Sequence, residues 1–322
     1  MQKVKWGVLG TADIARGQTI PGMRQAEHVE LYAIAGRKAE KAKAYREDFG
    51  FRKAYGSYDE LLADPEVEAV YIPLPNDLHC EWTIKALKAK KHVLCEKPLA
   101  VSEEQVTGMF RAAEENGVLL MEAFAYLHSP FVQAVKAEVD SGAIGEIRYM
   151  ESAFITGRRP DTDIRLRRET FGGAMFDLGC YDVSMALWLL GKEPESILAK
   201  AYFSERKIDL FTSAMLLYEG GTMAKLDCGM VLPDGRLDRL YIRGTRGEII
   251  SSTEFNQCGE TGYTVIRDGE KETKTVNTPN NYMLETEQLS RCILNGETPH
   301  VSKEFSLAEA RVMDRIMKEI GY

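Results

Sequence analysis

The sequence predicts an α/β protein of two domains, in which a doubly wound parallel sheet is followed by an α+β domain with a large, mainly antiparallel sheet. Three observations carry this prediction. The chain has 322 residues, about twice the usual length of one domain. Its first third alternates short β-branched segments with helical patterns, which is typical of βαβ units. Beyond Glu122 the pattern changes to consecutive strands separated by turns, so we expect domains over 1–122 and 123–322.

Short segments rich in Val, Ile and Leu mark the strands of the first domain, and helical patterns separate them. The strands are expected at 4–9, 29–34, 51–54, 67–72, 92–95 and 118–121. The helices between them include segments expected at 39–48, 81–89 and 103–116. Because strands that alternate with helices pair in parallel, this order predicts a sheet of the Rossmann type.

The second domain is expected to combine a few helices with hairpins. Its helices are predicted at 131–141, 172–191, 283–294 and 307–320. The helix at 172–191 is apolar almost all round, so we expect it to be buried. Turn residues typical of hairpins lie between alternating segments, and consecutive hairpins predict an antiparallel sheet. These turns are Glu219-Gly220-Gly221, Gly244-Thr245-Arg246-Gly247 and Asp268-Gly269.

Composition excludes several classes of protein. The chain carries 41 Lys and Arg against 49 Asp and Glu, a net charge of −8, which argues against nucleic-acid or anionic-membrane partners. No apolar stretch approaches the ~18 residues of a membrane span, and the chain begins without a signal-peptide pattern. The six cysteines lie too far apart for zinc-ligand pairs. We therefore expect a cytoplasmic protein with reduced thiols and no metal site.

The first strand runs into a turn of small residues of the GxGxxG type, with alanines in place of the second and third glycines. Its residues are Gly10, Thr11, Ala12, Asp13, Ile14 and Ala15. Small residues there allow a tight turn and the close approach of a pyrophosphate to a helix N-terminus. The turn alone does not choose the ligand, because an S-adenosylmethionine enzyme can open similarly, and such a turn also occurs without a ligand.

Arg37 and Lys38 follow the second strand, where a Rossmann domain recognises the adenosine ribose. An NAD site places a carboxylate there, whereas two cations suit a 2′-phosphate. The pair therefore favours NADP, with NAD as the less favoured cofactor. The alternative is a solvated start of the next helix, because three further cations follow closely.

Two further loops follow the ends of the fourth and fifth strands, on the edge where open parallel sheets bind ligands. The first loop contains Pro75 and Asn76 with His79 three residues on, and His79 either faces the ligand or caps its own helix. The second contains Glu96 and Lys97, where a partly buried ammonium needs a partner or a ligand. A lysine that reaches the surface is the alternative interpretation of Lys97.

The buried helix carries Asp177, Tyr181 and Ser184 at a spacing of i, i+4 and i+7, which places them on one face. Polar groups on a buried helix are satisfied by partners or face a cavity. The first case is a structural role in the core, and the second is a substrate site. Nearby, Arg165 belongs to a basic loop and is a candidate to reach the substrate.

These motifs, in this order and over essentially the whole chain, resemble the glucose-fructose oxidoreductase / inositol dehydrogenase / MocA family. The Glu96-Lys97-Pro98 element and the helix from Gly172-Gly173 to Tyr181 are its most specific features. With Tyr181 and Glu122-Ala123-Phe124, the sequence is most similar to the branch of dimeric dihydrodiol dehydrogenases and NADP-dependent xylose dehydrogenases. Phe171 departs from the family pattern, in which a third glycine is common.

The resemblance implies roles for individual residues. Lys97 would contact the nicotinamide ribose and the substrate, Tyr181 would donate or accept the proton, and Asp177 would orient the substrate hydroxyl. Tyr126 would belong to the substrate contacts, although Leu127 after it stands where the family often has Arg. The peptide bond before Pro98 would be cis. Two or more copies of the chain would pair through the C-terminal sheet.

We therefore expect an NADP-dependent oxidoreductase that interconverts an alcohol of a sugar-like or vicinal-diol compound with its carbonyl. Two alternatives stay open. One is a glycosidase of the same fold that retains NAD, which the cations at Arg37 and Lys38 disfavour. The other is a dinucleotide sensor with a silent site, which the set of Lys97, Asp177 and Tyr181 disfavours.

Replacing Arg37 with Ala tests the cofactor prediction. We expect the Arg37→Ala variant to bind NADPH more weakly by about 1.5 to 3 kcal/mol, the range for a charged hydrogen bond, and NADH almost unchanged. Titration of each nucleotide by fluorescence measures both affinities. Equal losses for the two nucleotides would contradict the assignment.

Overall fold

The computed structural model describes residues 2–252 and 255–322. These residues pack into two compact units. The first extends to residue 128 and also includes 280–306, and the second comprises 129–279 and 307–322. The division into domains at residue 122 stays a prediction, and the packing adds that segment 280–306 belongs with the first unit although it follows the hairpins in the chain.

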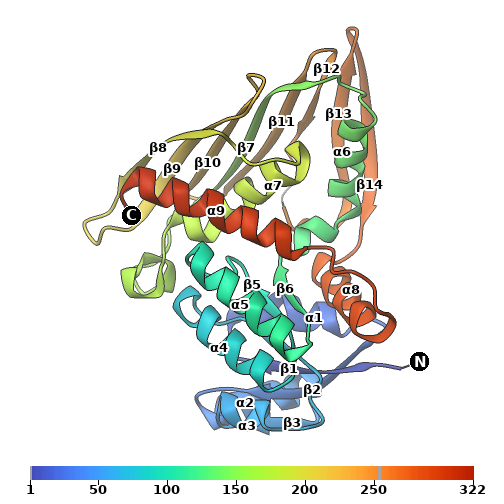
Figure 1. The fold of residues 1–322 in the computed structure, drawn as a ribbon, viewed down its shortest axis with the longest axis vertical. Coiled ribbons are helices and arrows are strands. Elements are labelled where there is room, and N and C mark those ends of the chain that lie inside the picture. The colour runs from blue at the N-terminus through green and yellow to red at the C-terminus, as the bar shows by residue number, and fades with distance from the viewer. Residues whose placement is uncertain (1, 253–254) are drawn as a thin grey trace. The chain divides into compact units, whose positions relative to one another are not determined.

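The first unit contains a six-stranded sheet in the order β3-β2-β1-β4-β5-β6, and all of its neighbouring strands pair in parallel, as predicted (Figure 1). The strand order reverses between β1 and β4, which is the point where an open sheet of this kind binds its ligand. The strands are β1 (Val4–Leu9), β2 (Val29–Ala35), β3 (Lys53–Tyr55), β4 (Ala69–Ile72), β5 (His92–Glu96) and β6 (Leu120–Ala123).

Side-chain caps and glycines set the ends of several helices in this unit. Ser57 and Ser102 each accept a hydrogen bond from the backbone N–H three residues ahead, and Gly50 and Gly117 end helices in the left-handed conformation. The helical segments are η1 (Ala15–Thr19), α1 (Ile20–Met23), α2 (Ala39–Phe49), α3 (Tyr58–Leu62), α4 (Asn76–Lys88), α5 (Glu103–Asn116), η2 (Ala125–His128) and α8 (Asn281–Asn295).

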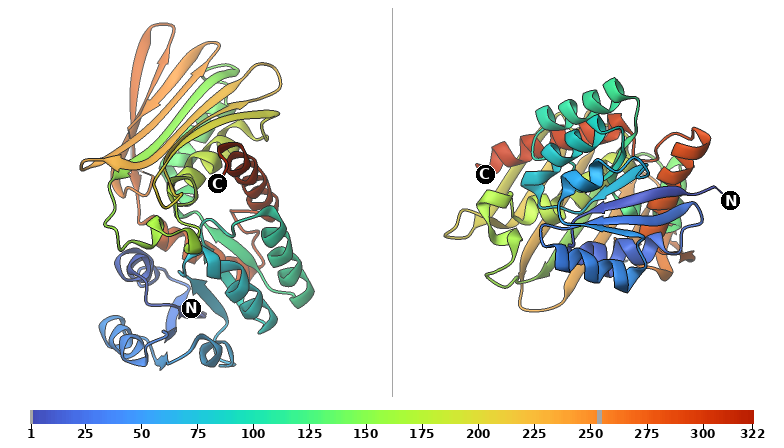
Figure 2. Two further views of the ribbon diagram at one scale, coloured as in Figure 1. Left: turned by 90° about the vertical axis from the view of Figure 1, so that its left-hand side faces the viewer. Right: turned by 90° about the horizontal axis from the view of Figure 1, so that it is seen from below.

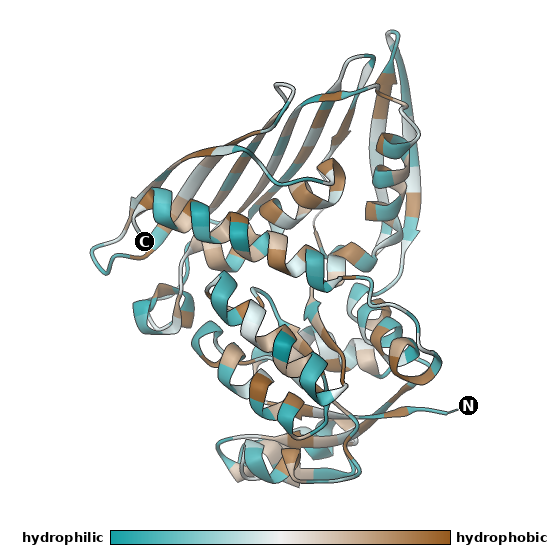
Figure 3. Cartoon of the chain, in the orientation of Figure 1, coloured by the Kyte–Doolittle hydropathy of each residue, from teal (hydrophilic) through white to brown (hydrophobic). Residues whose placement is uncertain are grey.

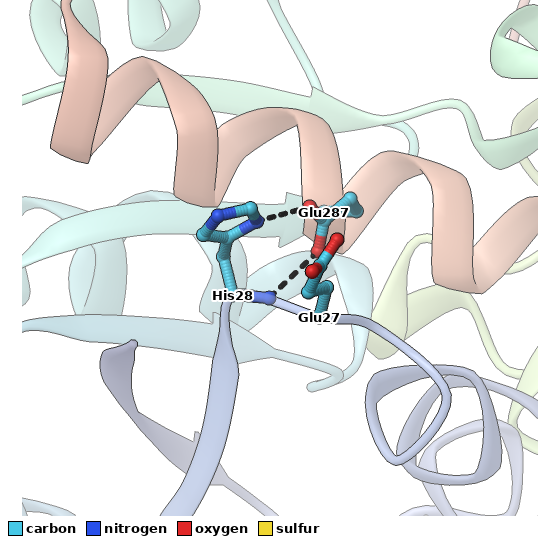
Figure 4. A group of neighbouring side chains, drawn as sticks. All are labelled: Glu27, His28 and Glu287. Atoms are coloured by element: carbon cyan, nitrogen blue, oxygen red, sulfur yellow. Dashed lines mark hydrogen bonds and ion pairs between the residues drawn. The ribbon is translucent and has the colours of Figure 1, made fainter. Parts of the chain in front are cut away.

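Helix α8 packs against the start of the chain. Glu287 accepts a hydrogen bond from the backbone N–H of His28 at 2.9 Å, and its second oxygen contacts the His28 ring at 2.5 Å (Figure 4). A side chain at Gly22 would meet the backbone N of Met283 at 2.7 Å, so only glycine allows this close approach of α1 and α8. These contacts explain why segment 280–306 belongs to the first unit.

The second unit contains an eight-stranded sheet in the order β14-β13-β12-β11-β7-β10-β9-β8. It is antiparallel except for the central pair of β7 and β10, and all three expected hairpin turns are present. The strands are β7 (Ile147–Gly157), β8 (Ser196–Phe203), β9 (Asp209–Leu217), β10 (Met223–Leu232), β11 (Arg236–Gly244), β12 (Gly247–Ser251), β13 (Gly259–Arg267) and β14 (Glu270–Thr278).

Helices α6 (Pro130–Asp140) and α7 (Cys180–Leu190), with the 307–320 part of α9 (Lys303–Ile320), lie on one face of this sheet (Figure 2). Burial alternates along the strands. Hydropathy alternates too, as the teal and brown bands in Figure 3 show. The strand register places five exposed apolar side chains on the opposite face, distributed over strands β8, β10, β11 and β12. They are Leu198, Tyr202, Met223, Leu237 and Ile250.

Three helices differ from the predicted bounds by more than two residues. The predicted helix at 172–191 becomes helical only after Gly173, because this residue has φ +118°, which no helix accommodates. It opens with η5 (Met175–Gly179), a single π-helical turn, before α7. Helices α4 and α9 begin earlier than predicted, because their first turns are polar and carry no apolar periodicity. In the described residues, no helix is both long and apolar enough to span a membrane.

Candidate active site

The turn after β1 brings the backbone close to the next loop of the sheet edge. Gly10 has φ +133°, and its N–H donates to the carbonyl of Ala35 at 3.0 Å. A Cβ at this position would meet Leu74 at 3.1 Å. The first turn of the following helix closes with a bond from Arg16 N to Ala12 O at 3.1 Å. The amides before Arg16 lack partners within the helix, which is the arrangement that binds a pyrophosphate.

Cations surround this turn. Arg37 and Lys38 are exposed at the end of β2, and their contact with a 2′-phosphate stays a prediction. Lys41, which the sequence analysis did not single out, donates to the carbonyl of Thr11 at 2.9 Å. Arg37 also lies near Tyr58, where its charge opposes the rise in the pKa of that phenol caused by burial. The tight turn at Gly10 and these positive charges together fit a phosphorylated dinucleotide.

His79 joins the two loops that follow β4 and β5. The side chain is completely buried, and its two ring nitrogens lie 2.8 Å from the carbonyl of Pro98 and 2.7 Å from that of Leu74. Burial lowers the pKa of the ring, and the two carbonyl contacts oppose that shift. Pro75 is the N-cap of α4 and Asn76 its first residue. His79 therefore supports the loop, and its expected contact with a cofactor stays a prediction.

The segment after β5 is held on several sides. The peptide bond between Lys97 and Pro98 is cis, as the family resemblance implied. Glu96 accepts hydrogen bonds from the Tyr71 hydroxyl at 2.6 Å and from the backbone N–H of Lys97 at 3.3 Å. Lys97 itself is half-buried, which suits a side chain that meets both protein and ligand.

Glu122 supports the same segment from β6. Its carboxylate accepts hydrogen bonds from the backbone N–H of Leu99 at 2.8 Å and from the hydroxyl of Ser306 at 2.6 Å. Burial raises the pKa of Glu122 to about 7, although these two donors and Lys97 act in the opposite direction. The sequence showed Glu122 only as part of a family motif, because its partners are distant in the chain.

Glu285 of α8 is a second buried carboxyl, which the sequence alone did not indicate. Neither of its oxygens has a hydrogen-bond partner among the described residues. Burial raises the pKa of Glu285 well above its usual value, and the charge of Glu96 adds to the shift. Tyr71 continues the polar cluster, because its hydroxyl accepts from Thr19 at 2.9 Å and donates to Glu96. A protonated Glu285 accounts for a carboxyl without donors in such a place.

Tyr126 lies in η2 of the first unit and is completely buried. Its ring meets Phe124 edge-on, with centroids 6.0 Å apart. The expected contact between Tyr126 and a substrate stays a prediction.

In the second unit, the structure brings Asp177 and Arg165 together. Arg165 Nε donates to Asp177 Oδ2 at 2.7 Å, and the charge of Asp177 raises the pKa of the guanidinium further. Arg159 approaches the same oxygen to 3.9 Å, and its Nε has no partner in the described part of the chain. The sequence indicated Arg165 but not Arg159, whose place depends on a loop without periodicity.

Tyr181 stands in an aromatic enclosure on α7 and is only 9% exposed. Its ring lies 5.3 Å from that of Phe154 and 5.2 Å from that of Phe255, measured between centroids. The amide nitrogen of Asn256 is 3.5 Å from the phenol oxygen. Ser184, expected on the same face, instead donates to the carbonyl of Tyr181 at 3.0 Å. The sequence did not indicate Phe255 and Asn256. They lie between β12 and β13 and come close to Tyr181 only in the folded chain.

Comparison with known proteins agrees with this arrangement. Residues 4–124 match the model of the oxidoreductase family with an NAD-binding Rossmann fold, and residues 132–250 match the GFO/IDH/MocA C-terminal domain. The chain belongs to the Gfo/Idh/MocA oxidoreductase family. Its first unit therefore contains the NAD-binding domain of the family, and the predicted fold and enzyme class are confirmed.

Several relatives in the family have named activities. The chain is 36% identical to D-xylose 1-dehydrogenase (NADP(+)) 2 of Haloferax volcanii, over 97% of this chain and 95% of that protein. It is 32% identical to trans-1,2-dihydrobenzene-1,2-diol dehydrogenase of Xenopus laevis, over 98% of each. The structure of KijD10, a 3-ketoreductase from Actinomadura kijaniata in complex with NADP and TDP-benzene, superimposes with a TM-score of 0.93 at 32% identity, covering 99% of this chain and 98% of that one.

Replacing Glu285 with Gln tests whether the buried carboxyl is protonated. The folded state retains this proton above the pH at which the unfolded chain releases it, near 4.3, so Glu285 lowers the free energy of unfolding progressively as the pH rises. We expect Glu285→Gln to raise the melting temperature relative to the parent chain more at pH 8 than at pH 5. Calorimetry at the two pH values measures this, and a difference independent of pH would contradict the assignment.

Proposed function

We propose that the chain is an NADP-dependent oxidoreductase that interconverts a secondary alcohol of a sugar-like or vicinal-diol compound with its carbonyl. One observation carries the proposal. A family NAD-binding domain is joined to a unit in which one helix presents Tyr181 in an aromatic enclosure and Asp177 paired with Arg165. This is a proton-transfer group beside a polar anchor, which reduction of a carbonyl requires.

The preference for NADP rests on the charges at the end of β2. Arg37 and Lys38 are exposed where a ribose 2′-phosphate would lie, and no carboxylate of the NAD type occupies that position. The NADP(+)-dependent xylose dehydrogenase and the complex of KijD10 with NADP support the same choice. Gly10 to Ile14 and Asn76 are proposed to line the dinucleotide, with His79 and Glu96 fixing the loops around it.

Tyr181 is proposed to move the proton. When bound, the nicotinamide supplies or accepts the hydride. A tyrosine with an ordinary pKa of about 10 is a weak base at neutral pH, so a positive charge is needed to stabilise the phenolate. We assign that charge to Lys97, and the Asn256 amide assists by donating to the phenol oxygen. Asp177 and Arg165 act as a pair that holds a substrate hydroxyl, with Tyr126 as a further proposed contact.

A substrate panel tests the function. Aldoses, inositols, deoxy-sugars and diols are scored with NADP and NAD in both directions by nicotinamide absorbance. We expect turnover of a sugar or diol with preference for NADP. Release of free sugar without net absorbance change would identify a glycosidase instead, and tight NADPH binding without turnover would identify a sensor.

Replacing Tyr181 with Phe tests the mechanism. We expect the hydride-transfer rate in a single turnover to fall by roughly 10²-fold or more, the usual size of a general acid–base contribution. NADPH affinity serves as the control for correct folding and should be unchanged. A near-normal single-turnover rate would remove Tyr181 from the mechanism.

We also propose that the protein is cytoplasmic, because its six free cysteines fit a reducing compartment.

We further propose that two copies pair through the open face of the eight-stranded sheet. The five exposed apolar side chains on this face support the pairing. Light scattering should give twice the chain mass, and Leu237→Glu should shift it toward the monomer. Lys88→Glu, at an exposed position on α4, should leave the mass unchanged. A parent chain that is monomeric at micromolar concentration would contradict the proposal.

A further inference from the structure

Tyr322 makes a contact within the second unit to which no function has been assigned. Its hydroxyl donates to the carbonyl of Gly172 at 2.6 Å. The Arg168 guanidinium lies 3.8 Å from the centre of its ring, and the Phe176 ring meets it edge-on with centroids 5.5 Å apart. The backbone N–H of Tyr322 donates to the carbonyl of Met317 at 3.0 Å, which anchors Tyr322 to α9. Tyr322 thus ties α9 to the loop that precedes η5.

The carbonyl that Tyr322 holds belongs to a turn in direct contact with the backbone of Arg165. Gly172 N donates to Arg167 O at 2.9 Å, and Gly173 N donates to Arg165 O at 2.8 Å. A Cβ at Gly172 would lie 2.3 Å from Arg165 O, so the two segments are as close as the backbone allows. A displacement of Gly172 therefore displaces Arg165.

The helix that carries Tyr181 has a separate support. The buried carboxylate of Asp209 accepts hydrogen bonds from the backbone N–H of Met175 and from the hydroxyl of Thr212, each at 2.8 Å. Loss of the Tyr322 hydroxyl leaves both bonds in place. Removal of the hydroxyl alone, which keeps the ring and its contact with Phe176, therefore disturbs the loop while the helix stays supported.

We propose that Tyr322 is a positioning residue that holds Arg165 against Asp177 and so sets the affinity for substrate. The inference rests on the proposed function, because that function assigns the Arg165–Asp177 pair to the substrate. Since Tyr181 stays supported by its own helix, loosening Arg165 weakens substrate binding and leaves proton transfer intact.

Kinetics of Tyr322→Phe and Tyr322→Leu test this proposal. We expect Tyr322→Phe to raise KM three- to tenfold, about the effect of one lost hydrogen bond, with kcat and NADPH affinity within about twofold of the parent. Tyr322→Leu, which also loses the Arg168 stacking and the ring contact with Phe176, should raise KM further. The control is Tyr263→Phe, which removes a phenol contact of 3.3 Å to Glu138 in the same unit and should leave KM unchanged.

Limited trypsin digestion gives a second measurement that needs no activity. Arg165, Arg167 and Arg168 offer cleavage sites in the loop, and mass spectrometry identifies the first bond cut. We expect faster cleavage there in both Tyr322 variants and an unchanged rate in the control. If the parent turns over no substrate in the panel, the proposed function fails while digestion still decides the loop contact. Unchanged KM and cleavage rates, or a lowered melting temperature alone, would overturn the proposal.

Discussion

The position of the Lys97 backbone is the constraint on which the rest of the first unit depends. Three side chains from three different elements fix the residues on either side of it. Tyr71 of β4 binds the carboxylate of Glu96, His79 of α4 binds the carbonyl of Pro98, and Glu122 of β6 binds the N–H of Leu99. All are buried, so each donor or acceptor that lost its partner would cost the full desolvation of a polar group. This cost holds the segment in one conformation at the carboxyl edge of the sheet, where a ligand binds.

The second unit orders its polar groups by a different means. A single π-helical turn at 175–179 precedes the regular helix α7, and Asp177 projects from that turn toward Arg165. A π-turn also follows the glycine turn of the first unit, at 15–19. Such turns widen the helix locally at the expense of regular hydrogen bonding, and they are frequent at functional sites. In both units the departure from regular geometry coincides with the segment assigned to ligand.

Sequence reasoning succeeded where the signal is local. Gly10 marks a position whose φ value only glycine adopts readily, and Arg37 follows a strand whose end the periodicity located. It failed for Glu285, Arg159 and Asn256. These residues gain their meaning from partners that are distant in the chain, and no spacing between neighbours reports such contacts. Phe171 illustrates an intermediate case, because its φ of +50° is a value that glycine adopts more readily, and this was visible only once the backbone was known.

The Asp177–Arg165 pair also bears on the chemistry of Tyr181. A carboxylate one helical turn from a phenol disfavours the phenolate by like-charge repulsion. Here that negative charge is offset, because Arg165 bonds directly to Asp177 and Arg159 stands 3.9 Å from the same oxygen. In the proposed mechanism, the guanidinium groups would therefore let the carboxylate hold a substrate hydroxyl without making the neighbouring phenol a poorer base. A neutral amide at position 177 would spare the repulsion but would accept a hydrogen bond more weakly, since charge-assisted bonds are about twice as strong. Under this proposal the basic loop would compensate the charge of Asp177, although the protein as a whole is acidic.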